Sequence, residues 1–241
     1  TVVRRVIIGW DDVPHLTEED KRRMSVGLLP HEIEARRTGL PTMATGLIYP
    51  FLAKDILVRP FALEYHHPGI IGLDVAWTAP TAGALLRYDT SSRVTYLVGE
   101  HYLERQPTSV HVSGLKRKFG CYPVRIDPNA NRKERDGETI IKEYKEEFGD
   151  GWEVRNANNR VHAGITKLYN AMSEGRFKVF NTCRHWIEEW SNYVWDGNER
   201  NSEGNPQPRK KDDHMQDATR YAYQDIEEAQ IENGGRNYRH P

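Results

Sequence analysis

The stretch "GIIGLDVAW" at residues 69–77 is a short apolar run that contains one acidic residue, Asp74. Its length and its β-branched residues predict a strand. Two more apolar segments, at 83–89 and 93–103, follow after short connections and predict three consecutive antiparallel strands. A lone buried carboxylate is costly unless it is paired or binds a cation, which makes Asp74 the first candidate site residue.

A second acid, Asp127, ends the apolar segment "YPVRIDP" at 122–128. A helix predicted at 109–120 precedes this strand, and a helical crossover makes it a parallel neighbour of the first strand. Ligands gather at the carboxyl ends of adjacent strands in such sheets, so Asp74 and Asp127 could lie side by side. Alternatively, each acid caps a loop or pairs with an arginine such as Arg125.

The segment "KKDDHMQDATRYAY" at 210–223 supplies further acids at the start of a predicted helix. Asp213 and Asp217 are four residues apart and therefore share one helix face. In one interpretation they direct oxygens at a cation, while His214 contacts a phosphate, relays a proton or serves as an outer ligand. In the other, Asp212 or Asp213 caps the helix and His214 is a surface residue.

Three or four converging carboxylates repel one another strongly, and a hard cation removes that repulsion. Oxygen ligands favour Mg²⁺ or Mn²⁺. Two such ions about 4 Å apart can activate a water molecule and stabilise the leaving oxygen of a phosphodiester. On this interpretation Lys210 and Lys211 approach the phosphate that is attacked.

The composition and net charge of the chain exclude some classes of protein. The 241 residues are 37% hydrophobic and 29% charged, with a formal net charge of −1, which excludes a globally basic nucleic-acid binder. No apolar run approaches the length of a membrane span. The two cysteines, Cys121 and Cys183, fit no zinc spacing and suit a reducing cytoplasm.

Basic residues gather between 115 and 135, including Lys116, Lys118 and Arg132. Such a patch can hold phosphates while the whole chain stays neutral. The alternative is a solvated helix face. No Walker A motif is present, so the chain by itself is not predicted to be a P-loop motor.

The three motifs "IGLDVAW", "VRIDP" and "DDHMQDATRYAY", in this order, resemble the nuclease domain of the large terminase subunit of tailed bacteriophages. The segments "IIGWDDVPHLTEED" and "ARRTGLPTMATGLIYPF" resemble the part that joins motor and nuclease in that family, so the likeness covers nearly the whole chain. The resemblance implies an RNase H-like α/β fold, with a mixed central sheet of three antiparallel and then parallel strands flanked by helices.

The same resemblance implies a Mg²⁺- or Mn²⁺-dependent endonuclease that cuts concatemeric double-stranded viral DNA during packaging. Asp74, Asp127 and Asp217 would be the core metal acids, with Asp213 as a fourth contributor and His214 as a catalytic residue. Related nucleases often have Glu at the second position, so the shorter Asp127 leaves the number of ions open. The residues expected to bind DNA are Arg209, Lys210, Lys211, Lys116, Lys118 and Arg132.

The resemblance also predicts the context of the chain. Residues 1–65 would be a lead-in from an ATPase domain that this sequence lacks, and residues 66–241 the nuclease domain. The small terminase subunit and the portal protein would be partners, in the cytoplasm of an infected host. Two alternatives stay open: a DNA-gripping module whose nuclease is gated by partners, with the loop at 196–209 covering the site, and another RNase H-like nuclease such as a junction resolvase or a transposase.

Overall fold

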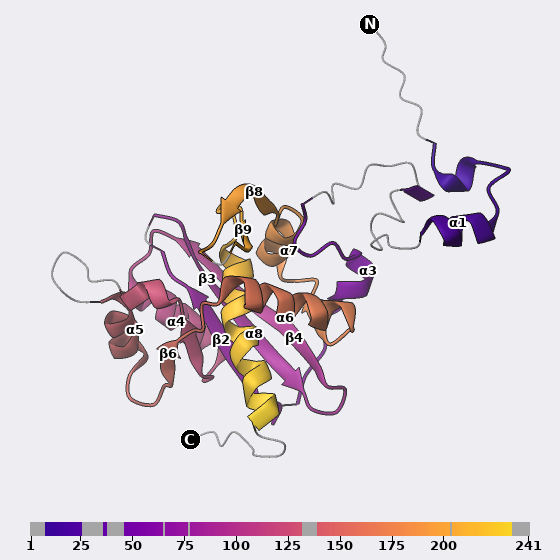
Figure 1. Ribbon diagram of the computed structural model, residues 1–241. Coiled ribbons are helices and arrows are strands. Elements are labelled where there is room, and N and C mark those ends of the chain that lie inside the picture. Colours follow the sequence, from indigo (N-terminus) through magenta and orange to yellow (C-terminus); the bar gives the residue numbers. More distant parts are fainter. Residues whose placement is uncertain are drawn as a thin grey trace, which may run out of the picture.

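The computed structural model describes residues 8–25, 36–37, 46–64, 66–76, 78–131, 139–202 and 204–232. Within them, one seven-stranded mixed sheet has the strand order β1-β7-β4-β3-β2-β5-β6. Helices cover both of its faces, and α8 lies across the sheet in yellow (Figure 1). The sheet strands are β1 (Leu57–Val58), β2 (Gly69–Asp74), β3 (Pro80–Asp89), β4 (Val94–Glu104), β5 (Val124–Ile126), β6 (Val154–Asn156) and β7 (Phe177–Phe180).

The pairing confirms the predicted mixed sheet. Strands β2, β3 and β4 are antiparallel neighbours, and β5 returns beside β2 in parallel. In this register Leu73 lies opposite Ile126, so the residues that follow them, Asp74 and Asp127, end adjacent strands at the same edge of the sheet.

The helices form two layers. They are α3 (Ala53–Ile56), α4 (Thr108–Phe119), α5 (Ile140–Phe148), α6 (Val161–Ser173), α7 (Arg184–Trp190) and α8 (His214–Glu232), with a 3₁₀ turn η2 at Pro128–Asn131. Helices α4 and α5 share one hydrophobic cluster with the sheet, and α6, α7 and α8 share the other.

The alternation of side chains along β2 determines which of the two helix layers Asp74 faces. Successive strand residues point to opposite faces of a sheet. Ile71 and Leu73 belong to the cluster on the α4 side, while Ile70 belongs to the cluster on the α8 side. Asp74 therefore faces α8, on which the acids of the third motif lie.

Gly72 lets α8 approach the sheet closely. A Cβ built on Gly72 would lie 1.8 Å from the carbonyl oxygen of Ala218, which belongs to α8. Only a residue without a side chain permits this backbone-to-backbone contact. The contact places the first turns of α8 over the carboxyl end of β2.

Residues that precede the boundary predicted between 65 and 66 contribute to the main sheet and its core. Leu57 and Val58 pair with β7 in the main sheet, and Ile48, Tyr49 and Ile56 are buried in the cluster under α8. Hydrophobic burial thus joins residues 47–58 to the same body as the motifs. The short apolar segments at 47–58 carry no local sign of these partners.

Before this point the chain forms η1 (Trp10–Asp12) and α1 (Glu18–Met24). The stretch "TEED" at 17–20 has the residues of a capping box and forms one, because Asp20 N donates to Thr17 Oγ1 and Thr17 N donates to Asp20 Oδ2. The stretch at 30–39, whose Pro30 and Gly39 predict the start and end of a further helix, falls largely outside the described residues. Among the helices that the structure describes, none combines the length and apolar character needed to cross a membrane.

Candidate active site

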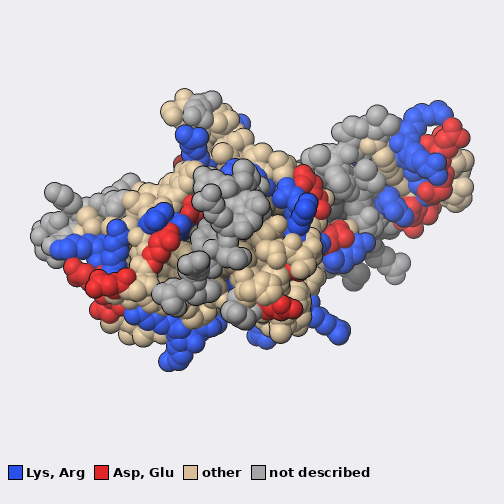
Figure 2. Space-filling view, turned by 90° about the horizontal axis from the view of Figure 1, so that it is seen from below, with Lys and Arg blue, Asp and Glu red and all other residues tan. Residues whose placement is uncertain are grey.

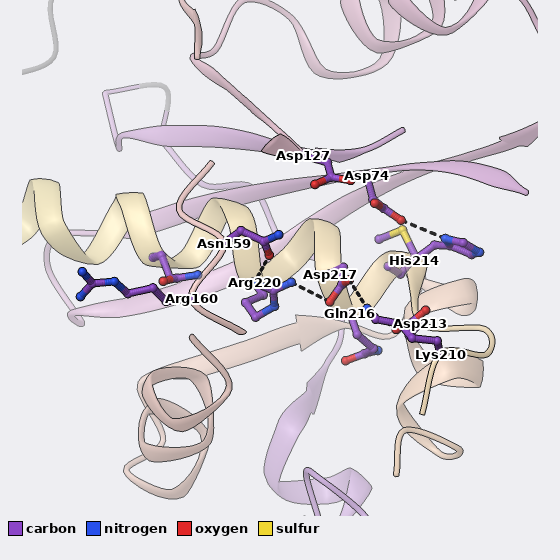
Figure 3. Close-up of polar contacts among 12 residues, drawn as sticks. Asp74, Asp127, Asn159, Arg160, Lys210, Asp213, His214, Gln216, Asp217 and Arg220 are labelled. Carbon is purple, nitrogen blue, oxygen red and sulfur yellow. Dashed lines mark hydrogen bonds and ion pairs between the residues drawn. The ribbon is translucent and has the colours of Figure 1, made fainter. Parts of the chain in front are cut away.

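Two acids come from the sheet. Asp74 ends β2, and Asp127 follows β5 directly, with its backbone N–H donating to the carbonyl of Leu73 at 2.9 Å. Figure 3 shows both side chains on the edge of the sheet that faces the first turns of α8. Asn129 donates to the Asp127 carboxylate through its backbone N–H and its side-chain amide and so orients it.

The alternative pairing with Arg125 does not occur. The guanidinium of Arg125 binds Asp225 on α8 and Glu153, the latter at 2.9 Å. Neither strand acid pairs with Arg125, while Asp127 accepts the backbone N–H of Asn129 and so also caps the turn that follows it.

Two more acids come from α8 and its preceding residue. Lys210 Nζ lies 3.1 Å from Asp213 Oδ2 and 3.1 Å from Asp217 Oδ2, so one ammonium bridges the two carboxylates. The other oxygen of Asp217 accepts from Arg220 Nη2 at 2.8 Å, and Arg220 also donates to Asn159 (Figure 3). Asp217 is thus held from both sides by cations.

Burial and neighbouring charge set the pKa values. Burial raises the pKa of Asp74 to about 6, with a further contribution from Asp217 and against the hydrogen bond from His214. Burial would also raise the pKa of Asp217, but Arg220 and Lys210 together outweigh it and hold that pKa below its ordinary value. The site therefore concentrates negative charge that cations compensate.

His214 lies between the sheet and the helix. Its Nδ1 is 2.9 Å from Asp74 Oδ2, and this hydrogen bond raises the pKa of His214 despite its partial burial. The surface-residue interpretation of His214 is therefore wrong. The imidazole links the first turn of α8 to the end of β2.

Glu189, a buried residue of α7, stands in no motif from which a role in the site could be predicted. Its Oε2 accepts from the backbone N–H groups of Met215 at 2.7 Å and Gln216 at 3.2 Å, both in the first turn of α8. A carboxylate from another helix thus provides the capping contact that the sequence interpretation assigned to Asp212 or Asp213. Asp213 pairs with Lys210 instead.

Arg220 is the second residue that the sequence reasoning missed. Its side chain is 1% exposed, and it lies three residues after Asp217 on the same helix. The i,i+3 spacing of Asp217 and Arg220 is a pattern from which the ion pair could have been predicted.

The basic residues predicted to bind DNA separate into two groups. Arg209, Lys210 and Lys211 are exposed on the segment that joins β9 (Pro206–Pro208) to α8. That segment follows a two-stranded ribbon formed by β8 (Trp195–Arg200) and β9, where the sequence predicted a loop or ribbon. These residues adjoin the acids.

Lys116 and Lys118 lie elsewhere. Both are at the carboxyl end of α4, which leads into the amino end of β5, at the sheet edge opposite Asp127. Lys116 donates to the carbonyl of Glu147, and Lys118 to that of Glu100. Arg132 lies outside the described residues. On the face seen in Figure 2, Lys and Arg side chains stand in small groups beside Asp and Glu.

The donors suit a hard divalent cation. Among the described residues, no three Asp, Glu, His or Cys side chains stand close enough together to form a metal site as they are. The available donors are nevertheless carboxylate oxygens, the ligands that Mg²⁺ and Mn²⁺ prefer. The ammonium of Lys210 already stands as a cation between two of them. The residues present therefore fit a divalent cation.

The mixed sheet with helices on both faces agrees with the comparisons with known proteins. The family model described as "Terminase RNaseH-like domain" matches residues 71–225. This chain belongs to that terminase family. The predicted RNase H-like fold is confirmed.

The similarity to an individual terminase extends over most of this chain. The large subunit of Salmonella phage P22 terminase is 32% identical over 218 residues, which are 88% of this chain and 42% of that protein. This chain thus spans less than half the length of the curated terminases that it matches.

Two solved terminase nuclease domains share the fold. That of P22 has a TM-score of 0.64 and 29% identity, covering 77% of this chain and 95% of that domain. That of bacteriophage SPP1, solved with bound Mn, has a TM-score of 0.54 and 19% identity, covering 70% of this chain and 95% of that domain. At this identity the SPP1 likeness shows the fold alone.

Proposed function

We propose that this chain is a metal-dependent endonuclease that cuts concatemeric double-stranded viral DNA during genome packaging. The observation that supports it most is that Asp74 and Asp127 end adjacent strands at the end of the sheet faced by the turn of α8 that carries Asp217. Membership of the terminase family and the likeness to the P22 nuclease domain support the reaction class. The Mn bound by the SPP1 domain supports a divalent cation.

Asp74, Asp127 and Asp217 would hold the cation, with Asp213 as a fourth contributor. When bound, Mg²⁺ or Mn²⁺ supplies an activated water molecule and stabilises the oxygen that leaves the phosphodiester. Asn129 orients the carboxylate of Asp127, and Arg220 orients that of Asp217. Fixed carboxylates lower the reorganisation that the reaction would otherwise require.

The remaining polar residues act on the substrate. Arg209, Lys210 and Lys211 would contact backbone phosphates beside the acids, because they are exposed on the segment that leads into α8. His214 is held at Nδ1 by Asp74, so its Nε2 is the atom at which a proton would be held or passed on.

The context of the reaction also belongs to this proposal. The nuclease would act together with an ATPase domain of the same polypeptide, the small terminase subunit and the portal protein, in the host cytoplasm. The curated large terminases that the chain matches are more than twice as long as the matched part, which leaves room for such a domain in them.

Plasmid cleavage in Mg²⁺, Mn²⁺ or EDTA tests the proposal. Wild type should nick and linearise the plasmid only with a divalent cation. Asp127→Asn and Asp74→Asn should reduce the rate about 1,000-fold, since roughly 4 kcal/mol of charge stabilisation is lost. Asp150→Asn changes an exposed acid on another loop and should cut at the wild-type rate.

Other outcomes separate the alternatives. Salt-sensitive DNA binding by a folded protein without cleavage under any cation would favour the gated gripping module. A marked preference for branched over linear duplex DNA would favour a resolvase. Equal cleavage by wild type and both strand-acid variants would refute the assignment of the site.

A further inference from the structure

The ammonium of Lys210 stands where the candidate site needs positive charge. It is 3.1 Å from one oxygen of Asp213 and 3.1 Å from one oxygen of Asp217. Both carboxylates are buried, so each would repel the other without a cation between them. Lys210 therefore compensates the charge of both carboxylates in the cation-free protein, as a divalent cation bound between them would.

The two oxygens of Asp217 have partners of different kinds. Oδ1 accepts from Arg220, whose side chain is 1% exposed, whereas Oδ2 accepts from Lys210, whose side chain is 59% exposed. Breaking a buried ion pair leaves an uncompensated charge and is strongly unfavourable. An exposed pair contributes little and exchanges readily. Lys210 is the partner that can leave, and Arg220 the one that stays.

The backbone around Lys210 allows such an exchange by side-chain rotation alone. Arg209 N donates to the carbonyl of Val194, and Lys211 N donates to the carbonyl of Arg209, each at 2.9 Å. Asp217 N donates to the carbonyl of Asp213, which begins the helix. The acids keep their places on α8 when the four-carbon side chain of Lys210 turns away.

We propose that Lys210 is an exchangeable counter-ion, which neutralises Asp213 and Asp217 in the cation-free protein and yields to the divalent cation. The released ammonium then meets a phosphate of the DNA backbone beside the site. This inference rests on the proposed nuclease function. Because DNA would draw Lys210 away from the acids, DNA binding and cation binding favour each other, and this coupling is reciprocal.

Calorimetric titration of the DNA-free protein with Mn²⁺ tests the competition without measuring cleavage. Occupation of the acids by Lys210 multiplies the Mn²⁺ affinity by the fraction of molecules in which the acids are free. If Lys210 contacts the acids in nine molecules of ten, the acids are free in one of ten, and Lys210→Gln should bind Mn²⁺ about tenfold more tightly than wild type. Lys211→Gln removes the same charge from the neighbouring residue, and its affinity should change by less than about twofold, as for exposed charges screened by salt. Asp217→Asn should lose Mn²⁺ binding.

A second measurement uses the wild-type protein. An amine-acylating reagent, read by mass spectrometry, should modify Lys210 faster when Mn²⁺ is added, while labelling of Lys211 stays constant. This readout needs no variant to fold.

The outcomes separate the two proposals. If wild type binds Mn²⁺ and Asp217→Asn does not, but Lys210→Gln binds no more tightly than Lys211→Gln and Lys210 labelling is unaffected by Mn²⁺, the exchange is refuted and the nuclease proposal stands. If neither wild type nor Lys210→Gln binds Mn²⁺, both are refuted.

Discussion

Substitution of Gly72 by alanine should move α8 away from the sheet and, through the same displacement, lower the cleavage activity of the site. The added Cβ would lie 1.8 Å from the carbonyl oxygen of Ala218 and 2.9 Å from the backbone N of Ala222. An ordinary contact begins at 3.4 Å, and backbone atoms of a packed helix cannot rotate away as a side chain can. The helix must therefore retreat by about 1.5 Å or β2 must bend.

The cost follows from that displacement. Overpacking of a core usually costs about 1 to 3 kcal/mol. Because the clash is with helix backbone, we expect the upper end, and a loss of about 3 kcal/mol lowers the midpoint of thermal unfolding by roughly 6 to 12 °C for a domain of this size. A catalytic group misplaced by about 1 Å can cost a hundredfold in rate. Asp213 and Asp217 move with α8, so cleavage should fall about a hundredfold even in the folded protein.

Thermal unfolding followed by circular dichroism, together with plasmid cleavage at a temperature where the variant is folded, measures both effects. Gly151→Ala is the matched control, since a Cβ there meets nothing within 4 Å. A Gly72→Ala protein with wild-type stability and wild-type cleavage would show that the close approach of α8 does not position the site.

Three further variants test buried polar groups, two beside the acids and one, His101, between β4 and α4. Glu189→Ala should lower the unfolding free energy by roughly 2 kcal/mol, because two N–H groups of α8 lose their acceptor, whereas Glu189→Gln should keep most of it; urea unfolding that fails to separate the two would contradict the capping role. Arg220→Met should lower the unfolding free energy by about 3 to 5 kcal/mol, because Asp217 stays buried with one partner fewer. A loss below about 1 kcal/mol in urea unfolding would contradict this. Burial, with His111 nearby, lowers the pKa of His101 from 6.5 to about 4, so the folded state binds its proton less readily than the unfolded state. The stability that neutral His101 contributes is complete above pH 6.5 and is lost as the pH falls towards 4, by up to about 3 kcal/mol. The unfolding free energy, measured at several pH values, should therefore fall less steeply with decreasing pH in His101→Gln than in wild type. Identical slopes in the two proteins would exclude His101 as the cause.

The local elements of the site could be predicted because they depend on neighbours in sequence. The apolar run around Asp74, the strand that ends at Asp127 and the helix that begins near Asp213 are present with bounds close to those expected. The parallel return of β5 beside β2 followed from the handedness of helical crossovers. These rules sufficed to place the two strand acids next to each other.

Contacts between distant segments could not be predicted in this way. Glu189 lies in a helix with no distinguishing motif, and only the packing of α7 against α8 brings its carboxylate to the N–H groups of Met215 and Gln216. The residues at 47–58 carried no sign that β1 would join β7. The position of Lys116 and Lys118 relative to the acids could not be predicted either, because proximity to Asp127 in sequence says nothing about which end of α4 faces the acids.

The sequence by itself determined the order of strands and helices, the acids that end two neighbouring strands, and the family of the chain. The tertiary structure alone decided how charge is compensated at the site: Arg220 is buried against one oxygen of Asp217, and Lys210 remains exposed at the other. The physical reason is that the strength of an ion pair depends on its burial. Burial is a property of the whole packed molecule, since Arg220 lies against Gly164 of α6, where an added Cβ would be 2.8 Å from its Cγ.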